Sequence, residues 1–180
     1  MKGFLFVLVQ AACAYNIGFI GMAGVGKTTL VQQLCDNSDT VSHQGDGTLH
    51  VVPYTQCIHN WTVYDFPGYG TNTVPDLQRF FAQAFTEIHL DLVVMCVGTR
   101  VYQQDAQAYA MMDVSRLTPL VVARTRCDVF PCDVFQLRLM SAESFPRSIA
   151  FPVSVGDELA NARIEMMTRF MDYMLKNPRQ

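Results

Sequence analysis

The chain has 180 residues, a length that suits one domain with a substantial hydrophobic core. Half of the residues (50%) are hydrophobic and 16% are charged, a composition that excludes an intrinsically disordered chain. The formal net charge is −3 and the 13 Lys and Arg residues are scattered, so the sequence lacks the concentrated positive charge of a nucleic-acid-binding groove. We therefore expect a folded domain with no nucleic-acid partner.

The cysteines show no pattern typical of a metal site or a disulfide framework. There are six, with no CxxC pair and no histidine at metal-ligand spacing: Cys13, Cys35, Cys57, Cys96, Cys127 and Cys132. We expect reduced thiols in a cytosolic protein, with disulfides in a secreted chain as the alternative.

Residues 1–15 form an apolar segment ahead of the predicted domain. Lys2, a short hydrophobic run and an A-x-A sequence ending at Ala14 resemble a secretory signal peptide. The run is too short to cross a bilayer. We favour an added strand or a packed N-terminal segment, and a membrane-touching segment and a cleaved signal peptide stay open as alternatives.

From residue 16 onward, apolar runs alternate with helical patterns, which predicts an α/β domain with a mainly parallel sheet and helices on both faces. The predicted strands are residues 17–20, 50–54, 61–65, 92–97, 120–124 and 149–154. The predicted helices are residues 28–35, 75–88, 104–115, 133–140 and 158–176. The second and third strands have a short connection with no helix, which predicts an antiparallel edge hairpin. This domain is expected to span residues 16–176, followed by a tail at 177–180.

A phosphate-binding loop follows the first predicted strand. The segment from Gly21 to Thr28 reads GMAGVGKT and matches G-x-x-x-x-G-K-[ST], with a strand before it and a helix after it. Its glycines let backbone N–H groups surround phosphate oxygens, Lys27 reaches the β- and γ-phosphates, and the Thr28 hydroxyl ligates Mg²⁺. The residues expected to bind nucleotide here are Gly21, Ala23, Gly24, Val25, Gly26, Lys27, Thr28 and Thr29. The predicted fold is therefore the P-loop NTPase three-layer sandwich.

A second motif, D-x-x-G, begins at the end of the third predicted strand. Asp65 is expected to hold a Mg²⁺-bound water, and the Gly68 N–H to reach the γ-phosphate. The pattern is common in turns, and its position at a strand end after a phosphate loop is what makes it informative. Together with Lys27 and Thr28, these residues are the predicted catalytic set within the two motifs.

A third motif indicates guanine rather than adenine. Thr125, Arg126 and Asp128 follow an apolar strand and correspond to the N/T-K-x-D base-recognition element. The Asp128 carboxylate can accept hydrogen bonds from guanine N1–H and the 2-amino group, and adenine offers no such pair. Arginine replaces the usual lysine and can stack on the base through its planar group. After the last strand, Ser154 and Val155 stand where a backbone N–H would bond guanine O6.

These motifs, with Thr48, Gly98-Thr99-Arg100-Val101 and Asp105, resemble the GTPase domain of the immunity-related GTPases, the p47 or interferon-inducible family. The resemblance covers residues 17–154. It implies that Thr48 is the switch I threonine that completes the Mg²⁺ coordination; from the residues alone, Thr40 and Thr48 remain alternatives. It also implies a homodimer across the nucleotide face and membrane association. The helical segments that flank the GTPase domain in that family are not evident here, which leaves both implications open.

Tyr69 follows the D-x-x-G motif, where Ras-like enzymes keep a glutamine that orients the attacking water. A phenol is a poor substitute, so we predict a GTPase that binds GTP, GDP and Mg²⁺ and turns over slowly without a partner. A nucleotide-holding interaction module with negligible turnover and an ATP-dependent P-loop kinase are the alternatives. Because the ligand is a cytosolic nucleotide, we expect a cytoplasmic protein, with membrane association and secretion left open.

Overall fold

The computed structural model describes residues 15–35, 50–70, 81, 85–115, 119–130, 132–133, 137, 143–146, 148–154 and 158–177. Six strands form one sheet in the order β2-β3-β1-β4-β5-β6. Their bounds are β1 Asn16–Gly21, β2 Val52–Tyr54, β3 Thr62–Asp65, β4 Leu92–Val97, β5 Leu120–Arg124 and β6 Ile149–Pro152.

The sheet is parallel except at one edge. β1 pairs in parallel with both β3 and β4, and β4, β5 and β6 continue in parallel, whereas β2 pairs with β3 in antiparallel. The predicted mainly parallel sheet and its antiparallel edge hairpin are therefore confirmed. β1 and β4 lie in the middle of the sheet, and β4 is buried along its whole length, which agrees with its uninterrupted apolar sequence.

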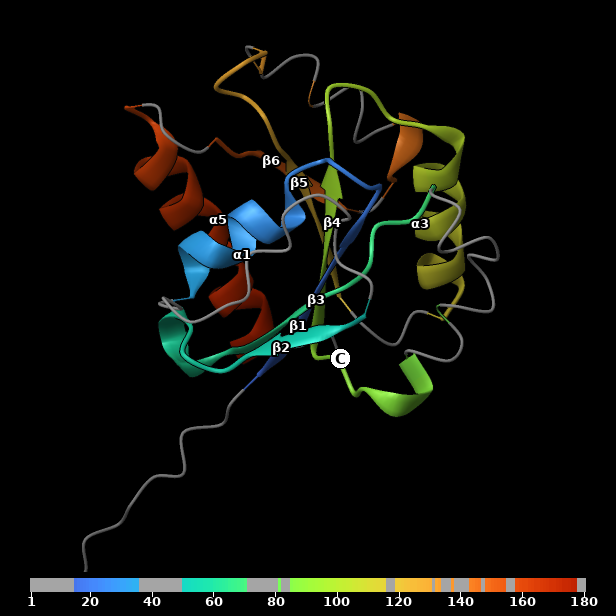
Figure 1. Cartoon of the computed structure of the whole chain (residues 1–180), viewed down its shortest axis with the longest axis vertical. Helices are drawn as coiled ribbons and strands as arrows, with labels where there is room; N and C mark the ends of the chain where they lie inside the picture. The colour runs from blue at the N-terminus through green and yellow to red at the C-terminus, as the bar shows by residue number, and fades with distance from the viewer. Residues whose placement is uncertain are drawn as a thin grey trace, which may run out of the picture.

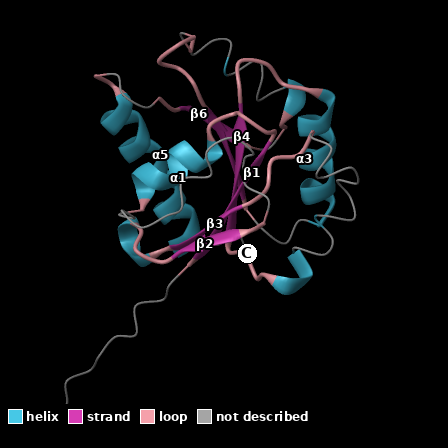
Figure 2. Ribbon diagram, viewed as in Figure 1, coloured by secondary structure: helices cyan, strands magenta, loops and turns pink. Residues whose placement is uncertain are grey.

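Helices cover both faces of this sheet (Figure 1, Figure 2). Helices α1 (Lys27–Leu34) and α5 (Ala160–Lys176) lie on one face, and α3 (Gln103–Ser115) lies on the other. Two apolar clusters fill the space between the layers. One contains Leu30 of α1 and Met171 of α5, and the other contains Ala108 of α3. The result is the predicted three-layer α/β sandwich, with the phosphate loop joining the central strand to α1.

Most element ends agree with the sequence-based ranges within two residues. The predicted helices at 75–88 and 133–140 lie largely outside the described residues, although 81, 85–87 and 137 are helical. Residues 1–14 also lie outside them, so the interpretation of the N-terminal segment stays a prediction. Within the described part of the chain, no helix is long and apolar enough to cross a membrane.

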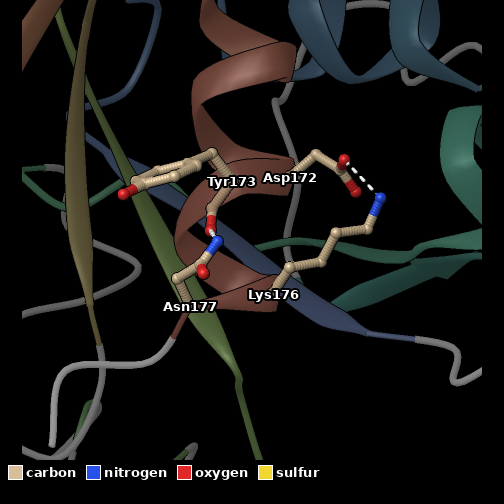
Figure 3. A network of polar contacts seen from close by, with 4 residues as sticks. All are labelled: Asp172, Tyr173, Lys176 and Asn177. Atoms are coloured by element: carbon tan, nitrogen blue, oxygen red, sulfur yellow. Dashed lines mark hydrogen bonds and ion pairs between the residues drawn. The ribbon is translucent and has the colours of Figure 1, made fainter.

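Local polar contacts close the last turn of α5 (Figure 3). The Lys176 ammonium pairs with the Asp172 carboxylate at 2.7 Å, one helical turn earlier. The Asn177 side-chain amide donates to the Tyr173 carbonyl at 2.9 Å, which satisfies one of the carbonyls left without a helical partner. A cation in the last turn also suits the negative end of the helix dipole.

The expectation of reduced thiols is wrong for four cysteines, which form the disulfides Cys35–Cys57 and Cys127–Cys132. Cys35 ends α1 and Cys57 precedes β3, and their backbones form an antiparallel bridge. Sequence spacing could not reveal this pair, because 22 residues separate cysteines that only the fold brings together. Among the described cysteines Cys96 is the free one, and its burial in β4 raises the pKa of its thiol to about 12.

Candidate functional site

The carboxyl ends of the parallel strands lie along one edge of the sheet, so the loops that follow them are neighbours. β1 leads into the phosphate loop and β3 ends at Asp65. β5 leads into residues 125–128, and β6 leads into Val153 and Ser154. The topology thus brings the predicted phosphate and base motifs to one edge of the domain.

Glycines at the start of the phosphate loop adopt conformations that other residues avoid. Gly21 has φ of +151°, and a Cβ there would lie 2.3 Å from the Cys96 carbonyl oxygen. Gly24 and Gly26 have φ of +73° and +95°. Gly26 is the N-terminal cap of α1 and offers no side chain to cap it, so the first N–H groups of that helix are available to an anion.

The Lys27 side chain is folded back over the loop. Its ammonium donates to the carbonyls of Gly21 at 3.1 Å and Met22 at 3.0 Å, and the residue is only 6% exposed. Burial lowers the pKa of Lys27, while the nearby Asp65 carboxylate favours its charged form. A buried ammonium held by neutral carbonyls is suited to an anionic ligand, because phosphate oxygens would replace those carbonyls with opposite charge.

Thr28 and Asp65 meet beside this lysine. The Thr28 hydroxyl donates to the Asp65 carboxylate at 2.6 Å, and Asp65 is fully buried at the end of β3. A hydroxyl and a carboxylate are the hard oxygen ligands that Mg²⁺ prefers, and here they lie next to the phosphate loop. These two residues, which the sequence assigns to Mg²⁺, therefore fit such an ion in both chemistry and position.

The D-x-x-G segment lies directly on the phosphate loop. Tyr69 donates its N–H to the Gly21 carbonyl at 3.3 Å, and its own carbonyl accepts from the Ala23 N–H at 3.0 Å. A Cβ on Gly68 would lie 2.5 Å from the Ala23 Cα, so only glycine permits this approach. Gly68 therefore lies beside the phosphate loop, where its N–H is expected to contribute to phosphate binding.

The base motif is bonded to the phosphate loop. The buried Thr125 hydroxyl lies within hydrogen-bond distance of the Val25 carbonyl at 2.5 Å and the Val97 carbonyl at 3.0 Å. The Arg126 guanidinium donates to the Gly24 carbonyl at 2.5 Å. The arginine in place of lysine therefore extends over the phosphate loop, and the two motifs form one connected structure.

Asp128 follows on the same loop and is exposed to solvent. The Cys127 N–H bonds to the Val153 carbonyl at 3.3 Å, which joins this loop to the end of β6. Ser154 is buried and its hydroxyl accepts from Arg163 of α5 at 2.7 Å. The two segments assigned to guanine recognition are therefore adjacent.

Of the other predicted site residues, Ala23, Gly24 and Thr29 are exposed on the loop and the first turn of α1. Thr48 and Val155 lie outside the described residues, so their placement stays a prediction.

The sequence did not reveal one pair at this site, Tyr69 and Asp105. The Tyr69 hydroxyl donates to the Asp105 carboxylate at 2.6 Å, and both side chains are buried. Asp105 belongs to the residues that carried the family resemblance and Tyr69 directly follows the D-x-x-G motif, which is the one signal that could have drawn attention to them. Their contact depends on the packing of α3 against the sheet, and no local sequence pattern predicts that packing.

Solved structures with this fold include GTP-binding proteins. A probable GTP-binding protein EngB superposes with a TM-score of 0.67 at 19% identity, over 89% of this chain and 98% of that one. Era from Aquifex aeolicus gives a TM-score of 0.61 at 16% identity, over 92% of this chain and 57% of that one. The G domain of the T. maritima FeoB iron transporter gives 0.57 at 16% identity, over 89% and 98%. At these identities the likeness establishes the fold alone.

No curated protein matches the sequence. The sequence pattern of the 50S ribosome-binding GTPase family, in contrast, matches residues 16–126. That stretch contains the phosphate loop, the D-x-x-G motif and the start of the base motif. The match and the geometry agree on a P-loop GTPase domain that binds guanine nucleotide. The chain belongs to the 50S ribosome-binding GTPase family.

Proposed function

We propose that this chain hydrolyses GTP to GDP with Mg²⁺, with slow intrinsic turnover, through a domain formed by residues 16–176. The observation that carries the proposal is the hydrogen bond between Thr28 and Asp65, 2.6 Å long, beside the buried Lys27. It joins the predicted metal ligands at the place where the phosphate loop would hold the triphosphate.

Each of these residues has a defined task in the reaction. Bound Mg²⁺ supplies positive charge that offsets the charge developing on the transferred phosphoryl group. Thr28 and Asp65 provide oxygen ligands, directly or through water, and Thr48 is the proposed further hydroxyl ligand. Lys27 provides a fixed positive charge at the β- and γ-phosphates, in a buried setting where charge interactions are strong.

Base recognition is the second part of the proposal. Asp128 accepts two hydrogen bonds from guanine, Arg126 covers the base, and a backbone N–H at Ser154 or Val155 bonds guanine O6. The bonds from Thr125 and Arg126 to the phosphate loop support this arrangement, because they hold the base loop next to the loop that is proposed to bind the phosphates. The Era structure that shares this fold was determined with GDP·AlF₄⁻ bound, which also supports nucleotide binding by this chain.

Slow turnover follows from the position of Tyr69. Its side chain is 1% exposed and its hydroxyl is bonded to Asp105, so it is turned away from the phosphate loop and does not orient water there. GTPases without a complete set of stabilising groups hydrolyse GTP at rates on the order of 10⁻⁴–10⁻² s⁻¹. We propose the same range here.

The test is single-turnover hydrolysis of GTP at several protein concentrations, with Mg²⁺ or with EDTA. We expect a slow Mg²⁺-dependent rate that Thr28→Ala abolishes and that Thr55→Ala leaves unchanged, because Thr55 is exposed on the β2–β3 hairpin connection. A fast rate that is independent of protein concentration, or one that survives EDTA, contradicts the proposal.

The resemblance to immunity-related GTPases adds a proposal about partners. A second copy across the nucleotide face would supply the groups that Tyr69 does not, and membrane association would concentrate the two copies. A turnover rate per molecule that rises with protein concentration, or on addition of lipid vesicles, supports this extension. A constant rate under both conditions excludes it without affecting the proposed hydrolysis.

The burial of Tyr69 also favours a second function, a module that holds guanine nucleotide and acts through its conformation with negligible turnover. The same assay separates the two, because such a module still holds GTP after about a day, whereas hydrolysis at the slow end of the proposed range has a half-life of about two hours. The cytoplasmic location stays a prediction. A nucleotide ligand favours it, whereas disulfides are typical of oxidising compartments.

A further inference from the structure

Tyr69 is the first residue after the D-x-x-G motif, and its side chain lies inside the domain. The ring makes an edge contact with Phe81, with 6.2 Å between ring centroids. Its hydroxyl donates to the Asp105 carboxylate at 2.6 Å. Burial and the neighbouring carboxylate both raise the pKa of the Tyr69 phenol, so it stays a hydrogen-bond donor at any ordinary pH.

Asp105 joins this tyrosine to helix α3. Its second oxygen accepts the Tyr102 backbone N–H at 2.9 Å, at the start of that helix. The residue is fully buried, and burial raises the pKa of its carboxyl. A carboxylate that accepts one bond from the helix start and one from the D-x-x-G segment fixes these two parts of the chain relative to each other.

The backbone of Tyr69 carries this restraint to the nucleotide site. The residue bonds to the phosphate loop through its N–H on Gly21 and its carbonyl on the Ala23 N–H, at 3.3 and 3.0 Å. On the other side of Gly68, the Phe66 N–H bonds to the Phe19 carbonyl at 3.0 Å. Gly68 lies between these two anchors, and a buried side chain secures one of them.

We propose that Asp105 is a positioning residue that acts through Tyr69 to hold the Gly68 N–H where a γ-phosphate is bound, and so sets the preference of the site for GTP over GDP. The inference rests on the proposed function and deepens it. GDP lacks the γ-phosphate, so a poorly placed Gly68 N–H weakens GTP binding and leaves GDP binding as it was. A purely structural bond would instead affect both nucleotides alike through stability.

The test compares Tyr69→Phe with Tyr109→Phe. Tyr109 is a matched control because it too is a buried tyrosine of the same apolar cluster and donates its hydroxyl to a backbone carbonyl, that of Pro146. Calorimetry gives the affinity of each variant for GDP and for a non-hydrolysable GTP analogue at fixed Mg²⁺, and a thermal melt gives its stability. We expect Tyr69→Phe to lower the ratio of analogue affinity to GDP affinity about fivefold, from the loss of one hydrogen bond. Tyr109→Phe leaves the ratio unchanged.

Asp105→Asn provides a second variant of almost the same shape. Its amide retains one acceptor oxygen for two donors, so we expect the same direction of change in the affinity ratio. If both variants keep the parental ratio, the positioning role is wrong even where their melting temperatures fall. If the parent chain binds neither guanine nucleotide, the proposed function fails first and this inference fails with it.

Discussion

The phosphate end and the base end of the site are built differently. At the phosphate end, Lys27 and Asp65 are buried, and glycine backbone lies against backbone at Gly21 and Gly68. At the base end, Asp128 is exposed on a loop. That loop is held by Thr125 and Arg126 at its start, and the Cys127–Cys132 disulfide follows.

This difference separates two properties of the protein. In the proposed function, phosphate binding depends on backbone geometry and buried charge, so changes there alter nucleotide affinity, and changes at the closely packed glycines also lower stability. Purine choice is proposed to depend on an exposed carboxylate, so a change there is expected to alter selectivity while the fold stays intact. The predictions below test this separation, beginning with the largest expected effect.

Lys27→Met is expected to weaken binding of both GDP and GTP about a thousandfold, because charge-assisted bonds to phosphate are lost. The free energy of unfolding of this variant should equal or exceed that of the parent chain. Burial lowers the pKa of Lys27, which means that its charge opposes folding, and methionine is apolar and of similar length. Lys176→Met, at an exposed ion pair, is the control and should leave affinity unchanged. A loss smaller than tenfold would contradict the role of Lys27.

Gly21→Ala is expected to lower the free energy of unfolding by about 4 kcal/mol, from overpacking and backbone strain together. The added Cβ would lie 2.3 Å from the Cys96 carbonyl oxygen. Gly24→Ala is the matched control. Its φ is also positive, but no atom lies within 4 Å of the added carbon, so we expect about 1 kcal/mol. Urea denaturation measures both, and equal losses would argue against close backbone packing at the phosphate end.

The two disulfides are expected to contribute different amounts to the free energy of unfolding. Cys57→Ser opens a link between residues 22 apart, and Cys132→Ser opens one between residues 5 apart. Loop-closure entropy predicts losses of about 3 and about 2 kcal/mol. Urea denaturation of the two variants and of the oxidised parent chain checks the order of the two losses. The parent chain in reductant, which opens both disulfides, is the reference for their combined effect. A parent chain that reductant does not destabilise would mean that these bonds do not form in solution.

Local patterns were sufficient for much of the fold. Alternating apolar and helical segments predicted the strands, and the short connection before Trp61 predicted the edge hairpin that is observed between β2 and β3. The phosphate loop was recognisable because its motif and its strand–helix context are both local in sequence.

The remaining features depend on contacts between distant residues. The Tyr69–Asp105 bond joins residues 36 apart, and the Cys35–Cys57 disulfide forms because α1 ends beside the segment that precedes β3. Neither contact has a local sequence pattern. The sequence shows that Tyr69 stands where Ras-like enzymes keep a glutamine, but it could not show that the phenol is directed into the core.

The central claim is that one guanine-nucleotide pocket joins the phosphate loop to Asp128. Calorimetric titration of the parent chain and of Asp128→Asn with GDP, ADP and XDP tests it most directly. We expect the parent chain to prefer GDP over ADP. Asp128→Asn should bind GDP about a hundredfold more weakly and prefer XDP, whose altered edge complements an amide. A parent chain that binds ADP as tightly as GDP, or a variant with unchanged preference, would contradict the account.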